Sequence, residues 1–262
     1  MYQRNEIEIS QKYLGNVFKQ LEGEVCILGG WAAYFIVNED FEKSTGMNYL
    51  GTRDIDVGFH IDMNWTVKQL ESSVFANAIK SMEAIGFRNV SFRWFKDFDA
   101  ETKKELTPEE SKRIPAYQII KLYVDPIVDN IHPLIKQVLG FHPIDEPLLS
   151  LVFKDNLCTF TKLFGTSIML PKPHVLLAMK LNSVTHRDKE YKRIKDIADI
   201  YALLWFSDVD IGELKTNLFK IYLKEKARKT VLGFNEKEIE KVSSLIEISA
   251  GSLKTVFSEL TK

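Results

Sequence analysis

The chain has 262 residues, of which 35 are Lys or Arg and 36 are Asp or Glu, so its formal net charge is −1. This balance excludes attraction to nucleic acid through bulk positive charge and leaves only a local basic surface open. An apolar content of 45% and a charged content of 27% are typical of a soluble globular protein, and the length suffices for two modest domains.

Cysteine usage and hydropathy predict the cellular compartment of the protein. The two cysteines, Cys26 and Cys158, give no disulfide framework, and Cys26 lies in a run that predicts a buried strand with a packed thiol. No window reaches the roughly 18 uncharged apolar residues of a membrane span, and the first residues lack a signal-like apolar region. We therefore expect a cytoplasmic protein with no membrane partner.

The first sixty residues predict a helix, a strand, a second helix, a loop and a second strand. Apolar positions first recur at helical spacing, and a short apolar run then ends in a pair of glycines. The expected elements are a helix over 7–21, a strand over 25–28, a helix over 31–37, a loop over 38–52 and a strand over 54–61.

The middle of the chain alternates between apolar runs and one long charged segment, which predicts strands around a solvated loop. The expected elements are an amphipathic helix over 66–85, a strand over 87–95, a charged loop over 96–114 with a short helix from Pro108, and strands over 117–128, 148–153 and 160–170.

After Pro171 and Pro173 only helical patterns remain. Two helices are expected within 174–206, and one each over 211–224 and 236–260. The sequence therefore predicts an α+β fold. Residues 1–170 would form an N-terminal domain with a mixed sheet flanked by helices, and residues 171–262 an all-α C-terminal domain.

Two aspartates, Asp54 and Asp56, lie two positions apart inside an apolar run. In a strand the side-chain period is two, so both carboxylates would project from one face, with their Cα atoms roughly 7 Å apart. Neighbouring carboxylates repel each other unless a cation lies between them. The pattern favours a divalent metal with oxygen ligands, above all Mg²⁺, while a solvated strand edge is the structural alternative.

The glycine pair Gly29-Gly30 follows a strand and precedes a helix. Such a turn presents free backbone N–H groups and the positive end of a helix dipole, which suit phosphate, although a glycine pair alone is more often only a turn. Phosphate, metal and two acids together indicate phosphoryl or nucleotidyl transfer.

Two segments resemble a known family. The sequence Leu-Gly-Gly at 28–30, followed by Thr-Arg-Asp-Ile-Asp-Val at 52–57, resembles the signature of the polymerase-β-like nucleotidyltransferase superfamily. In the C-terminal half, Ala-x-Lys at 178–180, Arg187 and Lys-Asp-x-x-Asp at 195–199 resemble the AbiEii/MenT branch of nucleotidyltransferase toxins. The resemblance implies a catalytic domain over 1–170 and a helical domain over 171–262 that completes the site.

The resemblance also implies roles for the residues of the first motif. Gly29 and Gly30, with Thr52 and Arg53, would bind the nucleotide, and the glycines would cradle its triphosphate. Asp54 and Asp56 would bind two Mg²⁺ ions. At Gly30 many relatives carry Ser, so this chain lacks a hydroxyl there.

A third acid should activate the attacking hydroxyl and serve as a further metal ligand. The candidate is Asp125, at the end of the strand stretch over 117–124, and Asp129 is the alternative. The family pattern places this acid between apolar residues, and Pro126 departs from that pattern.

In the second motif the resemblance implies that Lys180 contacts phosphate and that Asp196 orients it, with Arg187 and Lys195 as further phosphate contacts. The structural alternative is that Lys180 is a snorkelling surface lysine and that the basic positions around Lys195 form a solvated helix face.

The sequence thus predicts a Mg²⁺-dependent nucleotidyltransferase in which an acceptor hydroxyl attacks the α-phosphorus of an NTP and pyrophosphate leaves. The resemblance implies an RNA such as a tRNA, a protein or a small molecule as acceptor, and a partner antitoxin. Two alternatives remain open: a nucleotide-binding protein without catalysis and a partner-binding protein with the same fold.

Overall fold

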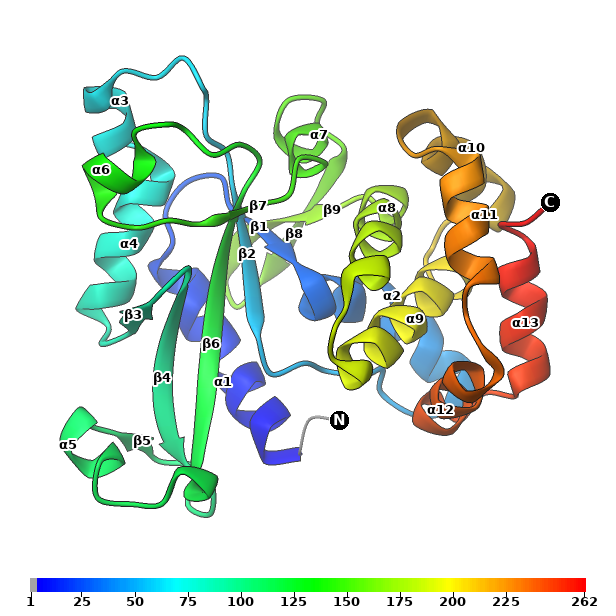
Figure 1. Cartoon of the computed structure of the whole chain (residues 1–262), viewed down its shortest axis with the longest axis horizontal. Coiled ribbons are helices and arrows are strands. Elements are labelled where there is room, and N and C mark those ends of the chain that lie inside the picture. Colours follow the sequence, from blue (N-terminus) through cyan, green and yellow to red (C-terminus); the bar gives the residue numbers. More distant parts are fainter. Residues whose placement is uncertain (1–3) are drawn as a thin grey trace. The chain divides into compact units, whose positions relative to one another are not determined.

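The computed structural model describes residues 4–262, which form two compact units (Figure 1). The sheet unit comprises 4–31 and 51–170, and the helical unit comprises 32–50 and 171–262. The α+β class and the helical C-terminal half that the sequence predicts are confirmed. Within the described residues no helix is long and apolar enough to cross a membrane.

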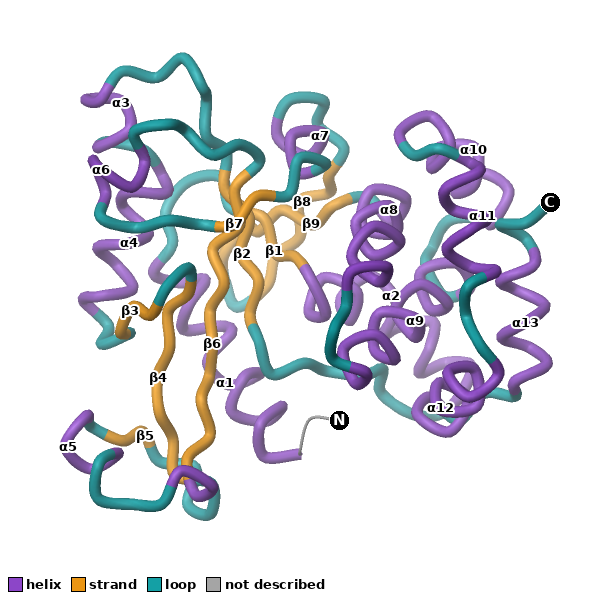
Figure 2. The backbone as a smooth tube through the Cα atoms, viewed as in Figure 1, coloured by secondary structure: helices purple, strands orange, loops and turns teal. Residues whose placement is uncertain are grey.

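A mixed sheet dominates the sheet unit, and its order is β3-β4-β6-β2-β1-β9-β8, with β5 beside β4 and β7 beside β6 (Figure 2). The strands are β1 (Cys26–Leu28), β2 (Ile55–Phe59), β3 (Arg88–Val90), β4 (Arg93–Asp99), β5 (Glu105–Leu106), β6 (Ile119–Val128), β7 (Ile144–Asp145), β8 (Cys158–Leu163) and β9 (Thr166–Pro171). Strand β2 pairs antiparallel with β1 and parallel with β6. The motif strand therefore lies inside the sheet, which excludes the solvated-edge alternative.

The helices of the sheet unit are α1 (Arg4–Gln20), α3 (Val67–Glu71), α4 (Val74–Ala84), α5 (Pro108–Ser111), α6 (Ile135–Leu139) and α7 (Leu149–Phe153), with a 3-10 turn at Ala116–Gln118. The single helix predicted over 66–85 is wrong, because Ser73 interrupts it. The Ser73 side chain accepts a hydrogen bond from the N–H of Ala76 and caps a new helix, α4.

Other predictions for the sheet unit also need correction. The run 148–153 forms helix α7 rather than a strand, because a short apolar run does not distinguish a buried helix from a buried strand. The strand predicted over 87–95 is the hairpin β3–β4, which turns at Ser91 with φ 58°. The segment 160–170 is likewise the hairpin β8–β9, with positive φ at Phe164 and Gly165.

Strand β4 continues to Asp99. Because residues 96–99 belong to a charged segment, the sequence had predicted a solvated loop there. Lys96 and Asp97 are buried there, because each has charged partners on neighbouring strands. Lys96 pairs with Glu105, and Asp97 pairs with Arg88 at 2.5 Å and Lys121 at 2.7 Å. Cross-strand pairing of this kind is not visible in the local sequence.

The helical unit contains most of α2 (Gly29–Thr45), together with α8 (Pro173–Ser183), α9 (Glu190–Trp205), α10 (Ile211–Ile221), α11 (Lys224–Leu232), α12 (Glu236–Ile246), α13 (Ala250–Ser258) and a 3-10 turn at Val184–His186. The helices predicted over 211–224 and 236–260 are wrong in extent, since α10 ends at Ile221 and α11 follows. Helices α12 and α13 are separated at Glu247, which has φ 55°.

Helix α2 is also longer than the sequence predicts. It begins at Gly29 and runs to Thr45, so only the last part of the expected loop over 38–52 is irregular. Ala33, Val37 and Phe41 recur every four residues and are 2% exposed or less. Burial of this stripe explains why a polar-looking segment remains helical.

Candidate nucleotidyl transfer site

The register of the sheet brings the predicted acids together. Asp56 lies in β2 between Leu28 of β1 and Asp125 of β6, which are its Cα partners on the two sides. Partners in register project to the same face, so the carboxylates of Asp56 and Asp125 are neighbours. Asp54 lies one residue before β2 begins.

The sequence predicted Asp125 at the end of its strand. In the structure Asp125 lies within β6, because the strand continues to Val128. Pro126 is tolerated because the pairing of β4 with β6 ends at Trp94 and Val124, so no β4 residue needs the missing N–H. The unexpected proline therefore does not disturb the sheet at the acid.

The alternative acid, Asp129, is engaged in structural hydrogen bonds. Its side chain is fully buried, and it accepts a hydrogen bond of 2.8 Å from the N–H of Ile61. Its second oxygen lies 2.5 Å from Nδ1 of His60. Asp129 is thus tied to Ile61 and His60, whereas Asp125 is the register partner of Asp56.

The glycine pair contacts the acid motif directly. Gly29 has φ +62°, and a Cβ atom there would lie 1.8 Å from Oδ2 of Asp56. A Cβ at Gly30 would lie 2.9 Å from the Cβ of Thr52. Glycine at 29 is therefore required by the carboxylate of Asp56, and Thr52 fills the space beside residue 30.

Two arginines neutralise the acids. Arg53 donates from Nε to Asp54 at 3.0 Å and from Nη1 to Glu6 at 2.9 Å. Arg93 donates from Nε to Oδ1 of Asp125 at 2.7 Å and from Nη2 to Oδ2 of the same carboxylate, and its Nη2 lies 3.6 Å from Asp54. We call the set Glu6, Arg53, Asp54, Asp56, Arg93 and Asp125 the acid cluster.

Both arginines of the acid cluster remain charged. Burial acts to lower the pKa of Arg53, but Asp54 and Glu6 together raise it above its ordinary value. Burial also acts to lower the pKa of Arg93, but Asp125 and Asp54 outweigh it and raise that pKa above its ordinary value. Sequence reasoning missed Arg93, since its link to Asp125 arises from the pairing of β4 with β6 and has no local signal.

The donor set of the acid cluster fits Mg²⁺, which prefers carboxylate oxygens. Among the described residues no group of three His, Cys, Asp or Glu side chains is arranged to hold a metal ion. Magnesium often takes only one or two protein carboxylates and completes its shell with phosphate oxygens and water. Asp54 and Asp56 are the pair that would hold it, and Asp56 is partly exposed.

The second motif forms a separate ion-pair network in the helical unit. Nζ of Lys180 on α8 lies 2.7 Å from Asp196 and 2.7 Å from Asp199, both on α9. Arg187 reaches Asp196 at 2.5 Å, and Lys195 pairs with Asp199. We call these five residues the lysine cluster; Tyr49 adds a hydrogen bond of 2.8 Å to Asp199.

The centre of the lysine cluster is buried rather than on a solvated helix face, since the side chain of Lys180 is 7% exposed and both aspartates are buried, while Arg187 is exposed. Burial acts to lower the pKa of Lys180, but the two aspartates outweigh it and raise that pKa above its ordinary value. Burial acts to raise the pKa of Asp196, but Lys180 and Arg187 outweigh it and lower that pKa below its ordinary value. Sequence reasoning left out Asp199 as a site residue, although it belongs to the quoted motif.

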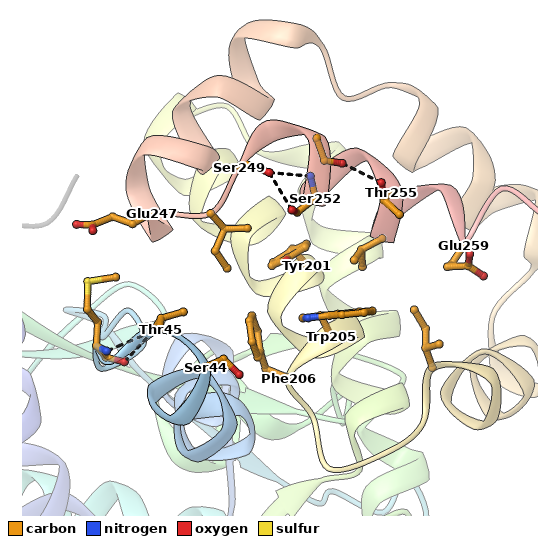
Figure 3. Close-up of a pocket in the computed structure, with 15 residues that line it drawn as sticks. Ser44, Thr45, Tyr201, Trp205, Phe206, Glu247, Ser249, Ser252, Thr255 and Glu259 are labelled. Atoms are coloured by element: carbon orange, nitrogen blue, oxygen red, sulfur yellow. Dashed lines mark hydrogen bonds between the residues drawn. The ribbon is translucent and has the colours of Figure 1, made fainter.

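A pocket of about 870 Å³ in the helical unit is a poor candidate for a triphosphate (Figure 3). Trp205 and Phe206 contribute aromatic surface, while Glu247 and Glu259 contribute carboxylates. None of the described residues that line this pocket is Lys, Arg or His. An anionic ligand would therefore meet no positive side chain there.

Comparisons with known proteins find a family match and a distant structural similarity. A search of curated proteins finds no match. A crystal structure of an antigenic nucleotidyltransferase-like protein from Paracoccidioides brasiliensis aligns with TM-score 0.42 and 14% identity, over 97% of this chain and 92% of that chain.

A family model described as nucleotidyl transferase AbiEii toxin of type IV toxin–antitoxin systems matches residues 52–255. The match starts after the glycine pair and includes Asp54, Asp56, Asp125, Lys180 and Asp196. It confirms the family resemblance and covers the second motif and the 52–57 part of the first. The chain therefore belongs to the AbiEii nucleotidyl transferase toxin family.

Proposed function

We propose that this nucleotidyltransferase moves a nucleoside monophosphate from an NTP to an acceptor hydroxyl, with Mg²⁺ held by Asp54 and Asp56. The observation that carries the proposal is the register that sets Asp56 beside Asp125, with its carboxylate against Gly29. When bound, the metal would neutralise phosphate charge and lower the pKa of the attacking hydroxyl. The start of α2 presents backbone N–H groups that suit phosphate oxygens.

The remaining predicted site residues support binding in this proposal. Arg53 places a permanent positive charge beside Asp54, and Thr52 packs against Gly30. In the lysine cluster, Asp196 and Asp199 hold Lys180 in one position and keep it charged. With Arg187 and Lys195 the cluster has one more cation than anion, which suits phosphate.

We further propose that the acceptor is an RNA, such as a tRNA, or a protein, because the family consists of toxins, and that the partner is an antitoxin. The test is incubation of the full chain with α-³²P-labelled NTPs, Mg²⁺ and total RNA or protein extract. Labelled acceptor and released pyrophosphate are expected.

Asp56→Asn should reduce this labelling by at least about 100-fold, because one metal ligand is lost. The matched control is Asp155→Asn, an exposed aspartate of the same unit. Equal labelling by Asp56→Asn and Asp155→Asn would overturn the proposal.

One observation favours a second candidate, a nucleotide-binding protein without turnover. The carboxylate of Asp125 is held at both oxygens by Arg93, so the group that should accept the proton is engaged. Calorimetry with each NTP, followed by a pyrophosphate assay on the same sample, separates the two functions. Binding without pyrophosphate release in the presence of acceptor would favour this second candidate.

A further inference from the structure

Arg93 holds two of the three acids at once. It is the first residue of β4, one position beyond the cross-strand pair Trp94 and Val124, and therefore lies opposite Asp125 on β6. Its guanidinium binds both oxygens of Asp125, and its Nη2 also lies 3.6 Å from Asp54. One fixed positive charge thus bridges Asp54, which the proposed function assigns to the metal, and Asp125, the third acid that the sequence analysis gives as a further metal ligand.

The surroundings of Arg93 stabilise this position. Its Cζ atom lies 3.9 Å from the centre of the Tyr123 ring, a close cation–π contact, and 5.5 Å from that of Phe92. The Arg93 side chain is 19% exposed, and those of Asp54 and Asp125 are 7% and 10% exposed. A bidentate pair that is largely shielded from water is stronger than a surface ion pair.

A divalent ion would seek the same oxygens. Close carboxylates need a positive charge between them, and Arg93 supplies one without any bound ion. Each oxygen that a metal takes from Asp125 or Asp54 must first lose its contact with the guanidinium. Arg93 cannot vacate the site by losing its proton, because an arginine remains protonated at any physiological pH.

We infer that Arg93 is a built-in competitor of the divalent metal: it occupies Asp125 and Asp54 and must be displaced from them when the metal binds. The inference rests on the proposed function, because it assumes that these carboxylates serve as metal ligands. It makes Arg93 a positioning residue that sets the metal concentration at which the site is loaded.

The test measures metal binding without nucleotide or turnover. Mn²⁺ is titrated into the full chain, and free Mn²⁺ is counted by electron paramagnetic resonance. Arg93→Gln should bind Mn²⁺ about tenfold more tightly than the unmodified chain, because a neighbouring positive charge and its hydrogen bonds are gone. Unchanged or weaker Mn²⁺ binding by Arg93→Gln would overturn the inference.

Arg88→Gln is the matched control. Arg88 lies on the neighbouring strand β3, stacks on Phe95 at 4.5 Å and pairs with Asp97 at 2.5 Å, so it loses the same charge in the same sheet. Its Mn²⁺ affinity should stay within about twofold of the unmodified chain, since the ion-pair partner of Arg88 is Asp97 rather than Asp54 or Asp125. An equal gain in both variants would reduce the effect to net charge and overturn the inference.

A second variant guards against a folding defect in Arg93→Gln. Arg93→Lys keeps the charge but not the bidentate geometry, so its Mn²⁺ affinity should lie between those of Arg93→Gln and the unmodified chain. The rise in melting temperature on adding Mn²⁺ should follow the same order. If nucleotidyl transfer is absent while the order of Mn²⁺ affinities holds, the proposed function fails and the inference about Arg93 stands. If transfer is present and the order of affinities fails, the inference about Arg93 fails and the proposed function stands.

Discussion

The acid cluster of the sheet unit and the lysine cluster of the helical unit are both networks of ion pairs, but their excess charge differs. Carboxylates outnumber cations in the acid cluster, and cations outnumber carboxylates in the lysine cluster. The first combines four carboxylates with two arginines, and the second combines two lysines and one arginine with two aspartates. Each cluster has buried members and one that is more open. Asp54 and Asp125 are buried and Asp56 is partly exposed, while Lys180 and Asp199 are buried and Arg187 is exposed. In the proposed function the open carboxylate of Asp56 would accept a metal ion, whereas removal of the buried Lys180 takes away the cation that two aspartates share.

The largest expected effect comes from the lysine cluster. Lys180→Ala would remove the buried cation that Asp196 and Asp199 share, leaving Arg187 and Lys195 as their remaining partners, and we expect a loss of about 3 kcal/mol in unfolding free energy. Urea denaturation measures this loss. The control, Lys237→Ala, removes an exposed lysine of α12 and should stay within about 0.5 kcal/mol. If both variants lose the same amount, the lysine cluster is not the stabilising feature described here.

In the acid cluster, Gly29→Ala should have the next largest effect. The new Cβ would overlap Oδ2 of Asp56, and a residue with φ +62° adds backbone strain. We expect a loss of about 2–3 kcal/mol together with weaker Mn²⁺ binding, because Asp56 must move.

The control for this change is Gly140→Ala, which has φ +66° but no atom within 4 Å of the new Cβ. It shares the backbone strain and should lose about 1–2 kcal/mol without altering metal affinity. Identical behaviour of the two variants would show that the contact between Gly29 and Asp56 does not matter.

A serine at position 30 should cost less. Gly30→Ser places a Cβ 2.9 Å from both the Cβ and the Cγ2 of Thr52, and we expect a loss of about 1 kcal/mol from overpacking. Thr52→Ala removes the Cγ2 but keeps the Cβ, so it should relieve part of the overlap, and the double variant should lose less than the sum of the two single losses. A simple sum of the two single effects would contradict this coupling.

Acid should weaken the lysine cluster gradually. The pKa of Asp196 is lowered in the folded state, so the stability it contributes is present above its unfolded pKa of about 3.9 and is lost as pH falls through the lower folded value. The effect is smaller than that of Lys180→Ala, because Lys180 keeps Asp199 as a partner while one carboxylate is neutralised. Urea denaturation between pH 6 and pH 3 should show a flatter decline for Asp196→Asn than for the unmodified chain; parallel curves would contradict the assignment.

Local patterns sufficed where neighbours in the sequence carry the information. The alternation of Asp54 and Asp56 with Ile55 and Val57 predicts a strand, and both apolar residues are fully buried. The packed thiol of Cys26 was also predicted correctly, and burial raises its pKa. Alternation and helical periodicity report burial directly, because they are repeated along one element.

Local patterns failed where an element depends on a partner far along the chain. The run over 148–153 has the composition of either a helix or a strand, and Lys96 and Asp97 look solvated until their charged partners on other strands are known. Long-range contacts override local propensity in such segments.

The sequence by itself determined the family motifs, the glycine pair and the candidate acids, because residue type and spacing along one strand or helix define them. Only the tertiary structure decided that Arg93 holds Asp125 and that Lys180 is buried between two aspartates. The physical reason is that ion pairing and burial depend on which residues the sheet register and the helix packing bring within a few ångströms, and the positions along the chain do not encode those distances.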